Sequence, residues 1–422
     1  MGEGFAKGRA EGRVPWVDTA KGVCIVLVVM MHATLGVGEA MGGEGFMHSA
    51  VAFAKPFRMP DFFLVSGLFL SRVIDRDWRS YADKRVVHFA YFYLLWFAIQ
   101  SVARLGQTSG GSAEGFVQHL ALSLVEPYGT LWFVYLLAVF SVATKLLRAV
   151  PAPLLLGGAA LLQIVPVHTG WTVIDEFCAR YVYFLAGYLL APAIFRLADA
   201  AVARAGLALA GLAVWAVING VLALTPSGFE RFPMLASLPV VSLALGAAGA
   251  VAIVTMAALL TQTRAAAPFA YAGRHSIAVY LAFFLPMAAT RTILVKTGII
   301  ADVGVVSAIV TTAAVLGPLV LERLVRDTRD GDAFEELVDM RERGVHEPCP
   351  LGEAPGERRV LGRELALVLH RREHLAHLIL APGVERDGEP RHDVRHDDLE
   401  GGDLGLDILA HGGSGVRDMG RP

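Results

Sequence analysis

Residues 22–36 read GVCIVLVVMMHATLG, an apolar run that carries a single ionisable side chain, His32. A helix needs roughly 17 to 25 mostly apolar residues to cross a bilayer, and this run with its flanks, residues 18–37, has that length. In the whole chain of 422 residues, 55% are hydrophobic and 18% are charged, whereas about a quarter of a soluble globular chain is charged. The stretch therefore predicts a membrane protein.

The same hydropathy pattern recurs along the first three quarters of the chain. It predicts an all-α, polytopic helical membrane protein with about ten transmembrane helices. Their expected ranges are 18–37, 47–71, 86–103, 130–149, 152–168, 178–195, 204–224, 237–261, 274–292 and 302–322.

Basic residues predict how this bundle is oriented. With the N-terminus inside, the loops expected in the cytoplasm hold 13 Lys and Arg, and the opposite loops hold 4. Cytoplasmic loops are enriched in these residues, so we expect a multi-pass protein of the cell inner (plasma) membrane. Residues 1–17 are then a cytoplasmic N-terminal segment, and the first span is retained because no small-residue cleavage site follows it.

The composition changes after residue 326. Residues 327–422 hold 13 Lys and Arg against 22 Asp and Glu, a net charge of −9, with no lysine, tryptophan or tyrosine. One interpretation is a solvated, disordered cytoplasmic tail, and the other is an out-of-frame translation of a GC-rich gene. His370, His374 and His377 share one helical face there, but no carboxylate or cysteine spacing supports a metal site. We expect a membrane domain at 18–326 and no bound metal.

Ionisable residues inside the first two expected spans predict a polar pocket. His32 lies deep in the first span, and Arg58 and Asp61 lie three residues apart in the second, on one helical face. Pro56 and Pro60 interrupt the backbone hydrogen bonding beside them. Intramembrane ionisable groups indicate function. The alternative is an Arg58–Asp61 ion pair that neutralises itself, with His32 bonded to a backbone carbonyl.

A basic cluster precedes the third expected span. Lys84, Arg85 and His88 fall within about a turn and a quarter of helix, so they can project toward one inner mouth. Such a cluster can bind the phosphates of a donor that arrives from the cytoplasm. The alternative is a group of charges that only sets topology.

These residues carry a resemblance to the acyltransferase type 3 family. The specific pieces are WVDTAKGVCIVLVVMMH (16–32) and FRMPDFFLVSGLFLS (57–71). Three weaker pieces follow in the family's order and complete a resemblance over about residues 13 to 326. They are GTLWFVYLLAVF (129–140), YVYFLAGYLL (181–190) and AGRHSIAVYLAFF (272–284).

The resemblance implies an integral membrane O-acyltransferase that modifies sugars and other hydroxylated acceptors. In this family the histidine that matches His32 is taken as the general base, and Arg58 matches a polar position before the Met-Pro string. Lys84, Arg85 and His88 fall where many members carry an Arg-x-x-Arg motif thought to handle the acyl donor, although His88 replaces the second arginine.

A second difference from the family lies in the ninth expected span, where many members carry a histidine just after the tyrosine. Here Tyr280 is followed by Phe283 and Phe284 instead.

Three further polar or aromatic positions are candidate supports for the site. Trp132 is interpreted as an interfacial aromatic, with stacking on a sugar as the alternative. His275 and Ser276 open the ninth expected span, where they either cap the helix or contact the donor.

The predicted activity is transfer of a small acyl group, acetyl foremost, from a cytoplasmic acyl-CoA to a hydroxyl of a glycan or lipid-linked sugar. His32 would deprotonate the hydroxyl, Arg58 would stabilise developing negative charge, and Lys84 and Arg85 would bind the donor. Acyl-CoA is a co-substrate, and no other cofactor and no nucleic-acid partner is expected. The alternative is a transporter or exporter of an acyl group, an organic anion or a modified sugar, without bond chemistry.

Overall fold

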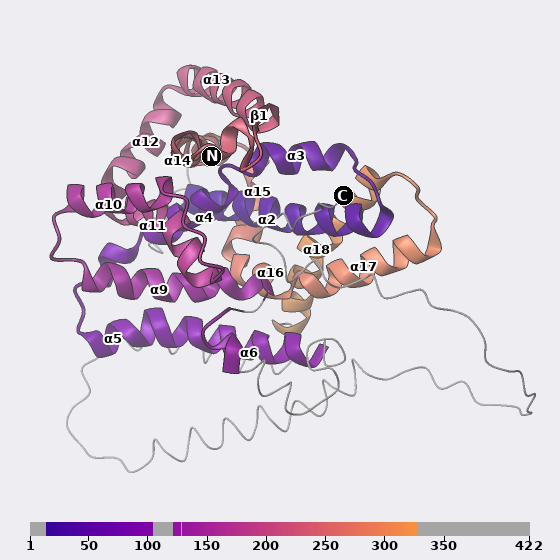
Figure 1. The fold of residues 1–422 in the computed structure, drawn as a ribbon, viewed down its shortest axis with the longest axis horizontal. Helices are drawn as coiled ribbons and strands as arrows, with labels where there is room; N and C mark the ends of the chain where they lie inside the picture. Colours follow the sequence, from indigo (N-terminus) through magenta and orange to yellow (C-terminus); the bar gives the residue numbers. More distant parts are fainter. Residues whose placement is uncertain (1–13, 104–120, 128, 327–422) are drawn as a thin grey trace, which may run out of the picture. The chain divides into compact units, whose positions relative to one another are not determined.

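The structure is a computed structural model that describes residues 14–103, 121–127 and 129–326 (Figure 1). Helices make up about 81% of this part of the chain, which confirms the predicted all-α class. The N-terminal residues before Val14, the tail from residue 327 and its three histidines lie outside the described residues, so the interpretations of the tail stay predictions.

The α-helices follow one another along the chain with short connections. In order they are α2 (Pro15–Met41), α3 (Phe46–Ala54), α4 (Arg58–Gly67), α5 (Trp78–Ala82), α6 (His88–Ala103), α9 (Trp132–Leu146), α10 (Ala152–Ile164), α11 (Thr172–Leu189), α12 (Ala191–Ala203), α13 (Ala205–Leu224), α14 (Pro239–Leu260), α15 (Ala266–Arg274), α16 (Ser276–Ala282), α17 (Phe284–Thr297) and α18 (Val303–Arg326). A small antiparallel hairpin of β1 (Pro226–Phe229) and β2 (Phe232–Met234) joins α13 to α14.

Fewer helices than expected are long enough to cross a membrane. Among the described residues five helices have the length and hydropathy of a span: α2, α9 with its preceding turn, α13, α14 and α18. Two bent pairs bring the number to at most seven, α11 with α12 at 76° and α16 with α17 at 49°. The prediction of about ten spans is not confirmed, in part because α10 has only 13 residues.

The second expected span is broken in two. Helix α3 ends at Ala54 and α4 begins at Arg58, with Pro56 in the turn between them. A proline lacks the backbone N–H and its ring clashes with the preceding turn, so it ends a helix. Pro60 falls in the first turn of α4, where an N–H has no partner within the helix. The break places Arg58 at a helix start inside the bundle.

Helix α2 is the centre of the fold and packs against α3, α4, α14, α15 and α16 (Figure 1). Its contact with α15 is the closest, because Gly22 meets the backbone of Phe269 and Gly273 meets the backbone of Asp18. A Cβ atom at either glycine would overlap the partner's backbone. Small residues allow such close approach of membrane helices.

We expect Gly273→Ala to destabilise the protein by about 1–3 kcal/mol, because the added methyl group forces α15 away from α2. Thermal unfolding of the purified protein in detergent measures the effect. Gly157→Ala in α10 is the matched control, since a Cβ there meets nothing within 4 Å and alanine favours the helix. Equal unfolding temperatures of the two variants would contradict this account of the α2–α15 contact.

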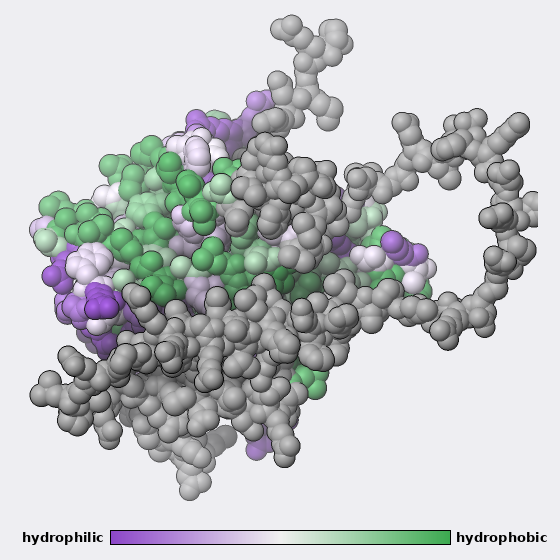
Figure 2. Space-filling view, turned by 90° about the horizontal axis from the view of Figure 1, so that it is seen from below, coloured by the Kyte–Doolittle hydropathy of each residue, from purple (hydrophilic) through white to green (hydrophobic). Residues whose placement is uncertain are grey.

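The surface is that of a membrane protein. Figure 2 shows that hydrophobic residues cover most of the described surface on this face, with hydrophilic residues gathered toward its margins. Helix α13 is the extreme case, because only 11% of its apolar window is buried inside the protein. Such a helix is stable only where lipid covers it.

Candidate active site

His32 lies on α2 in the interior of the bundle and is half-buried. Its imidazole contacts the ring of Phe283, with the two centroids 5.4 Å apart, and the positive charge of Arg58 acts on it. Neither of its ring nitrogens forms a hydrogen bond with the described residues. The alternative in which a backbone carbonyl holds the ring is therefore not observed among the described residues.

Arg58 and Asp61 do not neutralise each other. The Nε and Nη1 atoms of Arg58 and both carboxyl oxygens of Asp61 are buried, and none of them has a hydrogen-bond partner in the described chain. Arg58 instead interacts electrostatically with Glu176 and Arg180 of α11, and Asp61 with Cys24 and Tyr183. The predicted alternative of a self-contained ion pair is wrong.

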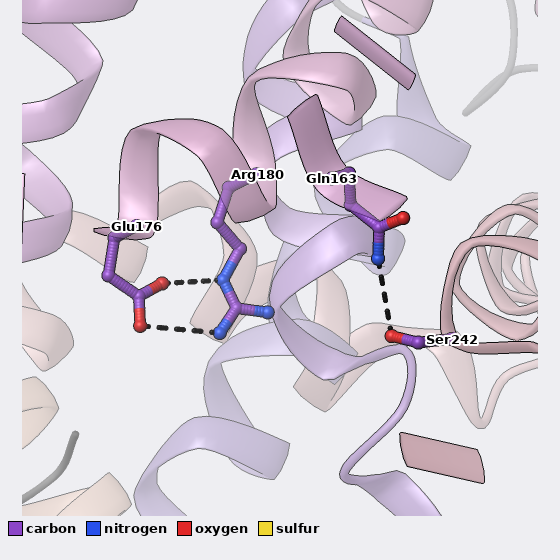
Figure 3. Close-up of polar contacts among 4 residues, drawn as sticks. All are labelled: Gln163, Glu176, Arg180 and Ser242. Atoms are coloured by element: carbon purple, nitrogen blue, oxygen red, sulfur yellow. Dashed lines mark hydrogen bonds and ion pairs between the residues drawn. The ribbon is translucent and has the colours of Figure 1, made fainter. Parts of the chain in front are cut away.

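Helix α11 adds polar groups to this region that the sequence analysis missed. Arg180 donates from Nε to Oε2 of Glu176 at 2.6 Å, one turn apart on the helix (Figure 3). On the neighbouring helices Gln163 donates from Nε2 to Oγ of Ser242 at 3.2 Å (Figure 3), and its Oε1 is buried without a partner among the described groups. Arg58 is thus within electrostatic range of Glu176 and Arg180, whose side chains can bind a hydroxylated ligand.

Two adjoining cavities lie at the N-terminal end of α2. The first, about 300 Å³, is lined by Asp18, Lys21, Arg72, Arg274 and Ser276 among others.

The second cavity, about 210 Å³, shares Lys21 and Ser276 with the first and adds Arg85. Aromatic rings form most of the rest of its wall, among them Phe133 and Tyr280. The pair of cavities therefore combines a basic mouth with an apolar interior.

A series of aromatic rings connects the wall of the second cavity with His32. Tyr280, which lines the cavity, has its ring centroid 6.4 Å from that of Phe283, and Phe283 contacts His32. Tyr280 is held in place because its hydroxyl donates to the carbonyl oxygen of Thr130. His32 lines neither cavity, and the fully buried ring of Phe283 adjoins both it and the cavity wall.

The predicted donor cluster is only partly brought together. Arg85 is half-buried and lines the second cavity, whereas Lys84 and His88 are exposed outside it. The three residues diverge because a π-helical turn, Asp83–Val87, widens the backbone spacing that a regular helix would have. Burial lowers the pKa of Arg85 from its usual value, and nearby Tyr81 acts in the opposite direction.

The segment before Arg85 is anchored to α9. Lys145 donates from Nζ to the carbonyl oxygens of Ile74 and Arg76, each at 2.6 Å, and its charge lies 4.5 Å from the centroid of the Tyr81 ring. Tyr81 in turn donates to the carbonyl oxygen of Ser141 at 2.7 Å. These contacts fix the position of the turn from which Arg85 enters the cavity.

Comparison with known proteins shows the family of this chain. The model of a family described as an acyltransferase domain matches residues 14–323, which is most of the chain. The chain belongs to the acyltransferase type 3 family. The predicted resemblance is thereby confirmed, and membership of this family favours acyl transfer over the alternative of a transporter.

One curated relative of this acyltransferase is the inner membrane protein YcfT of Escherichia coli strain K12. It is 25% identical over 163 residues, which are 33% of this chain and 45% of the relative. The match thus spans less than half the length of YcfT. No solved structure matches the acyltransferase chain.

The remaining predicted residues of the acyltransferase take distinct positions. His275 does not cap the helix that follows it, because its Nδ1 lies 2.7 Å from Oε1 of Glu322 on α18. Ser276 lines both cavities. Trp132 opens α9 and its ring lies 6.1 Å from that of Phe63, so it packs within the bundle.

Several residues of this acyltransferase site were missed from the sequence. Lys21 lies 11 residues before His32 on the same helix, and Arg180 lies inside the expected span 178–195. The rule that intramembrane ionisable groups indicate function would have found both. Arg72 and Arg274 carried no such signal, because both were counted among the basic residues of cytoplasmic loops.

Proposed function

We propose that this acyltransferase moves a small acyl group, acetyl foremost, from an acyl-CoA donor to a hydroxyl of a glycan or lipid-linked sugar. The donor enters from the cytoplasm, where the N-terminus and the cavity mouth beside Lys21 would lie. The protein would reside in the inner (plasma) membrane, as the name of the inner membrane protein YcfT indicates for that relative.

The observation that carries this proposal is the pair of adjoining cavities at the start of α2. Lys21 and Arg85 both line the second cavity, and neither forms an ion pair with the described residues. Asp18 at the mouth acts electrostatically on Lys21, but it is the one carboxylate among the residues that line the two cavities. Such an excess of cations favours an anionic ligand, and phosphates accept strong hydrogen bonds from these groups. Arg72 and Arg274 at the mouth extend the same charge.

The apolar part of the second cavity suits the rest of a coenzyme A thioester. Lys21 and His32 are separated by 11 residues, about 16 Å along the helix axis, a separation that an extended pantetheine arm can bridge. Phosphates at Lys21 would then place the thioester next to Tyr280 and Phe283. Since Phe283 adjoins both the cavity wall and His32, rotation of its ring would complete the path.

The proposed reaction uses His32 and Arg58. His32 accepts the proton of the acceptor hydroxyl, and the oxygen attacks the thioester carbonyl carbon. The unpartnered Nε and Nη1 groups of Arg58 donate to the negative charge that develops on the carbonyl oxygen. The carbon–sulfur bond breaks, and the coenzyme A thiolate takes the proton from His32.

The acceptor would bind beside Arg58, on which Glu176 and Arg180 of α11 act electrostatically. Glu176, Arg180 and Gln163 offer both donors and acceptors there, which is what binding of sugar hydroxyls requires. The Glu176 and Arg180 side chains are 20% and 25% exposed, so a ligand can reach them.

Mass spectrometry of surface glycans and lipids tests the proposed function. Cells that lack the protein should lose an acyl mass from one such molecule, and the wild-type gene should restore it. A strain with an unchanged set of acylated glycans and lipids would contradict the proposal.

We expect Arg85→Ala to raise the KM for acyl-CoA about 10-fold to 100-fold with a smaller change in kcat, because Arg85 binds ground state and transition state alike. Lys84→Ala is the matched control, since Lys84 is an exposed neighbour of the same charge outside the cavity. Steady-state kinetics of the purified protein separate the two. An equal rise in KM for both variants would instead assign donor binding to the surface cluster of Lys84, Arg85 and His88 that the sequence predicted.

A further inference from the structure

A third cavity lies away from the catalytic region, between α12, α13 and α14. It has a volume of about 560 Å³, within the range of small-molecule sites. The groove, as we call this cavity, is hollow because alanine and glycine line much of it, including Ala208, Gly211, Ala248 and Ala252. Two of its large apolar lining residues, Leu207 and Val251, are exposed at the surface.

The one charged residue that lines the groove, Arg204, lies at one of its ends. Arg204, which joins α12 to α13, and Thr255, near the end of α14, both line it. Helices α13 and α14 are consecutive and run in opposite directions, so these two residues mark the same end. Toward the other end α13 contributes Leu212 and Trp215, and α14 contributes Ala248.

The length of the groove matches one leaflet of a bilayer. Arg204 and Trp215 are 11 residues apart, about 16 Å along α13, and the hydrocarbon core of a bilayer is about 30 Å thick. Arg204 stands at the start of a 20-residue span, where a basic side chain reaches the headgroup region. The groove therefore begins at the headgroups and ends near the bilayer midplane.

We propose that the groove binds one anionic glycerophospholipid of the surrounding membrane. Its phosphate would bind Arg204, and one acyl chain would lie between α13 and α14 as far as Trp215. The charge of the phosphate complements the arginine at the polar end, and the acyl chain complements the apolar remainder. This site is separate from the acyl-donor cavities and shares no lining residue with them.

Native mass spectrometry of the delipidated, full-length protein in detergent tests this site. The probes are phosphatidylglycerol and a diacylglycerol with the same two chains, which differ by the phosphate headgroup. The wild type should bind phosphatidylglycerol about tenfold more tightly, and Arg204→Gln should remove this preference. Arg196→Gln, an exposed arginine on α12 outside the groove, should retain it.

The apolar part of the groove has its own pair of variants. Gly211→Leu should fill the groove and lower binding of both lipids about tenfold, while Gly206→Leu should leave binding unchanged. Both glycines lie on α13 with no atom within 4 Å of an added Cβ, but only Gly211 lines the groove. Thermal unfolding of the two variants verifies that both fold.

Three results would overturn the assignment. Equal binding of both lipids by the wild type would show that Arg204 does not bind the phosphate. Equal lipid binding by Gly211→Leu and Gly206→Leu would place the lipid elsewhere. A dimer that Gly211→Leu disrupts, with phosphatidylglycerol binding unchanged, would assign the groove to a second copy of the chain.

Discussion

His32→Ala is expected to lower kcat for acyl transfer by about 10²-fold to 10⁴-fold, the usual contribution of a positioned general base. The imidazole forms no hydrogen bond with the described residues and contacts the ring of Phe283, so its loss removes one ring contact and no hydrogen bond. Turnover of acyl-CoA by the purified protein, with membrane abundance measured in parallel, separates catalysis from folding.

Two further variants support that experiment. His32→Gln keeps a polar side chain of similar size without the base, and it should be as inactive as His32→Ala. Met31→Ala shortens the adjacent half-buried residue of α2 and should retain most of the activity. Activity of His32→Gln within a few fold of wild type would show that the ring has a structural role.

Arg58→Gln should reduce kcat by about 10²-fold to 10³-fold, the effect of removing one donor to a developing oxyanion. The KM for acyl-CoA should change little, because Arg58 lies away from the cations that would bind the donor phosphates. Arg58→Lys keeps the charge but loses the planar fork, so its activity should fall between those of the wild type and Arg58→Gln.

Lys55 provides the matched control for Arg58. It lies three residues earlier, at the end of α3, and its side chain is exposed. Lys55→Gln should therefore leave kcat unchanged. If Arg58→Gln raised the KM for the acceptor and left kcat intact, Arg58 would be an acceptor-binding residue and the proposed role in charge stabilisation would be wrong.

The sequence predicted the class of the fold and nominated the centre of the proposed site, because both depend on short-range patterns. Hydropathy identified the apolar runs, and the charged residues within them singled out His32, Arg58 and Asp61. It did not predict where the helices break. The 76° bend between α11 and α12 lies inside an apolar run that reads as one continuous span.

The interactions of the predicted residues could not be obtained from spacing. Arg58 and Asp61 share a helical face, yet the packing of α4 brings Arg58 close to α11 and Asp61 close to α2. His275 is held by Glu322, 47 residues later in the chain. Lys21 and Arg85 meet in one cavity only because α2 and the turn before α6 are adjacent in space. Such pairings depend on tertiary packing.

The shortness of α10 has a consequence for the membrane around the protein. Thirteen residues extend about 20 Å, roughly 10 Å less than the hydrocarbon core of a bilayer. A short apolar helix at the protein surface is matched by local thinning of the lipid. Gln163, one residue from the end of α10, would then lie near the headgroups, which shortens the path from water to the polar side chains of α11. Under the proposed function, bilayer thickness, and hence the lipid composition of the host cell, would determine how readily a polar acceptor reaches the site.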